Sequence, residues 1–121
     1  FVGNWNPHYD PGGIRLIPPL QRRALAEFLR TQDGFVHPAE NDPCSNALIE
    51  ALSCGLPAIY LKSGGHPEIV GAAGFGFSAR EEILELLDQL ADEYESRQSR
   101  IAVPLLLDVA EQYLKVMGIE Q

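Results

Sequence analysis

The residues from Asp42 to Pro57 combine a helix start, a carboxylate and an abrupt return to extended chain. Asp42 is predicted to cap a helix whose first residue is Pro43, so free backbone N–H groups should converge around residues 44–46. A phosphate or a sugar hydroxyl can bind to such a group of donors. Gly55 then ends the predicted helix. This pattern predicts an anion pocket of the kind that α/β folds build between a strand and a helix.

The other polar residues near this segment each have a structural explanation as well as a functional one. Glu50 can bind a ligand, or it can belong to a solvent-exposed stripe that it shares with other polar residues of the same helix. The pair Gly64 and Gly65 permits close approach of the backbone to a ligand, or marks an ordinary turn. His37 and His66 are lone histidines, which are more often packed or hydrogen-bonded than catalytic.

Composition limits the classes of partner. The chain has 121 residues, of which 45% are apolar, and its 9 basic and 17 acidic residues give a net charge of −8. This charge argues against nucleic acid as a partner. No apolar run approaches the ~18 residues that span a bilayer. Cys44 and Cys54 lack a C-x-x-C spacing and suggest neither a zinc site nor a disulfide. We expect a cytoplasmic domain without nucleic-acid partners.

Strands and helices alternate along the chain, which predicts an α/β fold: a doubly wound, Rossmann-like, mostly parallel sheet flanked by helices and incomplete at its N-terminal side. Ligands bind beyond the carboxyl ends of the strands in such sheets, so the loops after Ile17, His37, Leu61 and Phe77 should carry the site. The predicted strands cover 1–3, 14–17, 34–37, 57–61 and 74–77, and the predicted helices cover 20–30, 43–54, a short segment opened by Pro67, 79–95 and 104–116.

Three motifs in order resemble the C-terminal domain of retaining GT-B-type glycosyltransferases, and the group 1 family most closely. Asp42 and Glu50 are an acidic pair with seven intervening positions, the segment 53–57 reads small-x-Gly-x-Pro, and the segment 64–68 reads Gly-Gly-x-Pro-Glu. The resemblance covers roughly residues 14–95. The family more often has Glu where this chain has Asp42, followed by a Gly-rich turn, so the donor sugar stays open.

The resemblance implies that the domain binds a nucleotide sugar. Asp42 would accept hydrogen bonds from hydroxyls of the transferred sugar, and the backbone N–H groups of Ser45, Asn46 and Ala47 would meet the sugar and the diphosphate. Glu50 would accept from the ribose, about 12 Å away if both acids lie on one helix. The remaining predicted substrate-binding residues are Cys44, Gly64 and Gly65. No metal or cofactor is expected, because the nucleoside-diphosphate sugar is itself the donor substrate.

The resemblance also implies transfer with retention in a cleft between two domains. The Arg and Lys that neutralise the leaving diphosphate in the family have no counterpart here, so the catalytic residues are unassigned. We expect residues 1–121 to form a single, truncated C-terminal domain that is inactive without an N-terminal acceptor-binding domain, through which any peripheral membrane association would occur. The alternatives are a non-transferring relative such as a nucleotide-sugar epimerase, and a stand-alone Rossmann-like module such as a response-regulator receiver.

Overall fold

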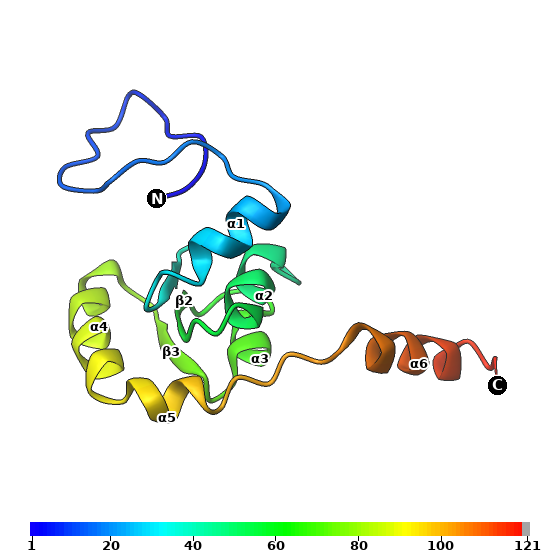
Figure 1. The fold of residues 1–121 in the computed structure, drawn as a ribbon. Helices are drawn as coiled ribbons and strands as arrows, with labels where there is room; N and C mark the ends of the chain where they lie inside the picture. The colour runs from blue at the N-terminus through cyan, green and yellow to red at the C-terminus, as the bar shows by residue number, and fades with distance from the viewer. Residues whose placement is uncertain (120–121) are drawn as a thin grey trace.

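The computed structural model describes residues 1–119, which are organised around a parallel sheet of three strands in the order β1-β2-β3 (Figure 1). The strands are β1 (Phe35–His37), β2 (Ala58–Leu61) and β3 (Gly74–Phe77). β1 follows Gly34, β2 follows Pro57 and β3 begins at Gly74. All three strands consist mainly of apolar residues, the pattern typical of strands in a sheet that is covered on both faces. The three predicted strands in this part of the chain are therefore confirmed.

Helices cover both faces of this sheet. Ala58 and Tyr60 of β2 pack with Leu48 and Leu52, whereas Ile59 between them packs on the other face with Phe77 and Leu90. The predicted open Rossmann-like α/β fold is thus confirmed. The helical elements are α1 (Arg22–Leu29), α2 (Asn46–Ser53), α3 (His66–Val70), the 3-10 turn η1 (Arg80–Glu82), α4 (Ile83–Asp92), α5 (Tyr94–Gln98) and α6 (Leu106–Val116).

The predicted strand at residues 14–17 is wrong. Only a single parallel bridge forms there, between Val2 and Ile17, with hydrogen bonds of 3.0 Å from the Gly3 N–H and 2.9 Å to the Phe1 carbonyl. Pro18 and Pro19 follow directly and carry no N–H groups, so the pairing cannot continue. The predicted strand at residues 1–3 is wrong for the same reason, since only Val2 takes part in this bridge and no strand forms there.

The single predicted helix at residues 79–95 is divided into η1, α4 and α5. The break between α4 and α5 lies at Glu93, whose carboxylate binds the Arg97 guanidinium at 2.6 Å. Arg97 also donates to the Ala72 carbonyl at 3.2 Å and lies 4.2 Å from the centroid of the Phe75 ring. These contacts hold α5 against the start of β3.

α6 stands away from the other elements at the end of an extended segment (Figure 1). None of its residues is buried, and Leu106, Leu107 and Val116 are each at least 75% exposed. Among residues 1–119, no helix is both long enough and apolar enough to cross a bilayer.

Candidate functional site

The start of α2 is set by Ser45 and not, as predicted, by Asp42 and Pro43. The Ser45 hydroxyl accepts a hydrogen bond from the Leu48 N–H at 3.3 Å, which makes it the N-cap of a helix that begins at Asn46. Asp42 instead accepts from the Cys44 N–H at 3.1 Å and closes a local turn before the helix. Asp42 and Ser45 are both good capping residues. Ser45 sets the start of the helix because its hydroxyl also contacts the buried side chain of His37, at 2.9 Å. The helix ends as predicted, since Gly55 adopts a φ of +87°.

This corrected boundary changes the expected spacing of the acidic pair. Asp42 lies in the turn that precedes α2, whereas Glu50 lies within the helix. The separation of about 12 Å along one helix therefore does not apply. Glu50 is exposed and forms no salt bridge with any residue from 1 to 119.

The first turn of α2 offers hydrogen-bond donors. Within the described residues, the backbone N–H groups of Ser45, Asn46 and Ala47 donate to no other atom, as is general for the first turn of a helix. Ser45 is buried, whereas Asn46 and Ala47 are exposed. Two of the three predicted donor groups thus belong to residues that face solvent at the positive end of a helix.

The glycine pair packs against the turn that contains Asp42. A Cβ atom on Gly64 would lie 2.2 Å from the Asp42 carbonyl oxygen, and one on Gly65 would lie 2.2 Å from the Pro43 carbonyl oxygen. The Gly65 N–H donates to the Asp42 carbonyl at 3.0 Å, and the Asn41 N–H donates to the Ser63 hydroxyl at 2.9 Å. The two glycines are therefore required for backbone-to-backbone packing, whatever else they contact.

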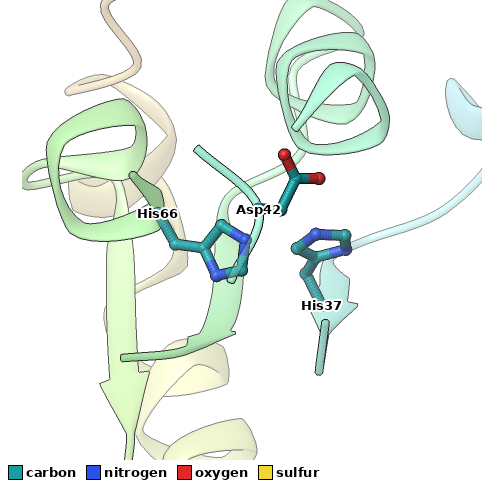
Figure 2. Close-up of side chains that lie close together, drawn as sticks. All are labelled: His37, Asp42 and His66. Atoms are coloured by element: carbon teal, nitrogen blue, oxygen red, sulfur yellow. The ribbon is translucent and has the colours of Figure 1, made fainter. Parts of the chain in front are cut away.

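Two histidines that the sequence presents as unrelated meet beneath this turn (Figure 2). Their ring centroids are 4.7 Å apart with an edge-to-face angle of 71°. His37 Nε2 is 2.9 Å from the buried hydroxyl of Ser45, and His66 Nδ1 is 2.9 Å from the Leu61 carbonyl oxygen. Burial, reinforced by the nearby His66, lowers the pKa of His37, although the Asp42 carboxylate opposes the shift. This shift favours the neutral form of His37.

The structure brings together most of the predicted site residues. Asp42, Cys44, Ser45, Gly64 and Gly65 lie in or against one turn, whereas Glu50 lies further along α2. Sequence reasoning did not join His37 and His66 to this group. Their positions in the sequence could have indicated that they meet. His37 ends β1 and His66 closely follows β2, and these two strands are parallel neighbours.

An apolar hollow of about 580 Å³ lies beside the site. It includes Cys44 and Gly65, but its other walls are mostly the apolar side chains Ile49, Ile69, Val103 and Val109. Asp42 and Glu50 do not line it. A charged diphosphate requires donors, so the exposed start of α2 suits such a ligand better than this hollow does.

Known proteins match the part of the chain that contains the candidate site. The family model for glycosyl transferases group 1 matches residues 11–102. Over 52 residues the chain is 36% identical to a D-inositol 3-phosphate glycosyltransferase of Jonesia denitrificans, covering 43% of this chain and 12% of that protein. Over 86 residues it is 31% identical to a sulfoquinovosyl transferase of Arabidopsis thaliana, covering 65% of this chain and 17% of that protein. No solved structure matched.

The chain therefore aligns with less than a fifth of the length of each of these curated relatives. The family match covers most of the chain, including every predicted site residue and all three strands of the sheet. The chain belongs to the group 1 family of glycosyl transferases.

Proposed function

We propose that this chain is the donor-binding part of a larger two-domain glycosyltransferase that takes a sugar from a nucleoside diphosphate with retention of configuration. The observation that carries the proposal is the exposed start of α2, where free N–H groups and the exposed carboxylate of Glu50 belong to the same helix. Family membership supports glycosyl transfer as the reaction.

The chemistry of the donor matches these groups. A diphosphate only accepts hydrogen bonds, and the N–H groups of Asn46 and Ala47 only donate them. The positive end of the α2 dipole adds to the attraction. A ribose diol offers two donors to the Glu50 carboxylate, which accepts only. In this proposal the diphosphate accepts from the first N–H groups of α2, and the ribose hydroxyls donate to Glu50 on the same helix.

Asp42 is assigned to the transferred sugar. Its Oδ1 atom accepts from the Cys44 N–H, so the carboxylate is held in place and its second oxygen remains to accept from a sugar hydroxyl. The acceptor-binding domain and the groups that neutralise the leaving diphosphate belong, in this proposal, to other parts of the protein. No residue of this chain is assigned a catalytic role.

Binding of nucleotides to single-site variants tests these roles. Thermal unfolding is followed with UDP, GDP, ADP and their sugars, because a ligand at 100 times its Kd stabilises the folded state by ~2.7 kcal/mol. Glu50→Ala should weaken binding of free nucleotide and nucleotide sugar alike, by about tenfold or more for a lost hydrogen bond to a charged group. Asp42→Ala should weaken binding of the nucleotide sugar only.

Glu111→Ala, on the exposed surface of α6, is the matched control and should bind as the unaltered chain does. Equal losses of free-nucleotide affinity in Glu50→Ala and Asp42→Ala would contradict the assigned roles. If none of the nucleotides raised the unfolding temperature, the donor-binding proposal itself would be wrong.

A further inference from the structure

His37, Asp42 and His66 form a compact cluster at the carboxyl ends of β1 and β2. Each contributes one potential ligand atom, and these atoms all lie within 4.8 Å of one another. His66 is fully buried and His37 is 9% exposed, whereas Asp42 is partly exposed. The cluster combines two imidazoles and one carboxylate, a donor set that suits first-row divalent cations.

His66 has an unused ligand atom. Because its Nδ1 lies 2.9 Å from the Leu61 carbonyl, which can only accept, Nδ1 carries the proton and Nε2 carries a lone pair. Nε2 is buried and has no hydrogen-bond partner among residues 1–119. Figure 2 shows this edge of the ring turned toward Asp42 and His37. A histidine anchored through one N–H on a backbone carbonyl is the usual form of a metal ligand.

His37 is also held in place. The Ser45 hydroxyl lies 2.9 Å from its Nε2 and accepts from the Leu48 N–H at the same time. Coordination through Nε2 would replace the contact with Ser45 and leave that hydroxyl bonded to the Leu48 N–H. The hydroxyl would keep the Leu48 N–H as a partner, but its own O–H would have to turn from Nε2 to another acceptor, a cost that cation binding has to offset.

We propose that His37, Asp42 and His66 bind a first-row divalent cation, with Zn²⁺ as the ion of reference. Ligand atoms around tetrahedral zinc lie about 3.4 Å apart, given Zn–N and Zn–O distances near 2.1 Å. The three side chains thus need to close by little more than 1 Å, which is about the reach of small side-chain rotations. Mg²⁺ and Ca²⁺ are disfavoured, because they take oxygen ligands.

Three protein ligands leave one tetrahedral position open. The cation would join the end of β1, the turn before α2 and the start of α3. The inference does not rest on the proposed function, although both assign a role to the Asp42 carboxylate. Cation binding is measured without any nucleotide, and nucleotide binding is measured with a chelator, so the two proposals fail separately.

Titration of the metal-free chain with Co²⁺ and then Zn²⁺ tests the site, by visible absorption and by calorimetry. One equivalent should bind, and His66→Asn should weaken binding at least about 100-fold, more than loss of a second-shell partner does. The Asn amide is placed to keep the bond to the Leu61 carbonyl while it removes Nε2. His8→Asn, in the exposed N-terminal loop, is the control and should bind as the unaltered chain does.

The exposed Cys44 thiol is a competing zinc ligand, so the titration is repeated with Cys44→Ser. Binding that disappears in Cys44→Ser but survives in His66→Asn would overturn the proposal, and so would the absence of any bound equivalent.

A measurement on the unaltered chain covers the case in which His66→Asn does not fold. Ring ¹⁵N chemical shifts are recorded during the zinc titration. The shifts of His37 and His66 should change together at one equivalent, while those of His8 should not. Unchanged shifts of His66 would show that its lone pair serves a bound water or nothing, and would overturn the proposal.

Discussion

The hydroxyl of Ser45 has two tasks at the residue scale. It caps α2 through the Leu48 N–H, and it lies 2.9 Å from His37 Nε2 at the end of β1. Because the side chain is only 1% exposed, both contacts are protected from water. The direction in which the first turn of α2 presents its N–H groups is thus set by a buried contact with the sheet. Pro43, which the sequence favours as the first helical residue, lies outside the helix for this reason.

Substitution of the glycine pair should separate crowding from backbone strain. Gly65 has a φ of −89°, so Gly65→Ala should cost about 1–3 kcal/mol of unfolding free energy from the clash with the Pro43 carbonyl alone. Gly64 has a φ of +55° and meets the Asp42 carbonyl, so Gly64→Ala should cost more, because the strain of a left-handed residue adds about 1–2 kcal/mol.

Gly12 provides the matched control for this comparison in urea unfolding. It has a φ of +57°, and a Cβ atom there would meet nothing within 4 Å. Gly12→Ala should therefore show the strain without the clash. If Gly64→Ala were no more destabilising than Gly12→Ala, the turn at 63–65 would not pack as closely on the turn at 41–45 as described.

At the scale of elements, terminal contacts decide where helices begin and end. Glu82 reaches back to accept from the N–H groups of Ser78 and Ala79, both at 2.7 Å, and thereby closes the turn between β3 and α4. Glu93 and Arg97 likewise fix the break between α4 and α5. Carboxylates accept more strongly when they are ionised, so we expect these two contacts to weaken in acid.

The Glu82 contact should appear in the pH dependence of stability. The N–H groups of Ala79 and Ser78 hold the pKa of the Glu82 carboxyl below its ordinary value of 4.5. A lowered folded-state pKa means that the stabilisation is present above about pH 4.5 and is lost as the pH falls through the folded-state pKa. The unfolding free energy of the unaltered chain minus that of Glu82→Gln should therefore be constant at neutral pH and shrink in acid.

Asp88→Asn, on the exposed face of α4, is the control for the general effect of removing one negative charge. The Glu82→Gln difference is compared with the Asp88→Asn difference measured over the same pH range. A Glu82→Gln difference that stayed constant from pH 7 to pH 3 would show that the capping contact does not form.

The elements that the sequence predicts well are those with a strong local pattern. The strands at residues 34–37, 57–61 and 74–77 are short apolar runs next to Gly or Pro, and the structure places each within one residue of its predicted bounds. The isolated run at 14–17 has a similar local pattern but lacks a continuous partner. Pairing is a property of two segments, so a single run cannot reveal it.

The same distinction applies to the candidate site. Asp42, Ser45 and Glu50 are visible in the sequence because the helix signals and the motif spacing lie within a few residues. The predicted start of α2 is wrong because Asp42 and Ser45 are both good capping residues, and only the tertiary contact with His37 distinguishes them. The meeting of His37 and His66 depends on the parallel alignment of β1 and β2, which no local pattern encodes.

At the scale of the whole molecule, the α/β unit and α6 differ in how much apolar surface they bury. The core includes Leu48, Leu52, Ile59 and Leu90, all buried, whereas within the described residues α6 buries none of its side chains. Only its first half contributes to the apolar hollow, through Leu106 and Val109. The stability of the chain therefore resides in the part that carries the candidate site.

Removal of residues 105–121 should lower the unfolding free energy by less than about 1 kcal/mol, because little apolar surface is lost from a packed environment. Leu90→Ala, in the core between α4 and the sheet, should cost about 2–5 kcal/mol and is the comparison for the same denaturation measurement. A truncated chain as unstable as Leu90→Ala would mean that α6 packs on the body in solution.

The contact between the turn at 41–45 and the turn at 63–65 has a practical consequence for protein engineering. Two hydrogen bonds and the close backbone packing of Gly64 and Gly65 join these segments, although about twenty residues separate them in the chain. If the first segment alone were replaced by that of a homologue, it would pack against a second segment to which it is not matched. A chimera should exchange both segments as one cassette, and libraries that randomise either one should keep the glycines fixed.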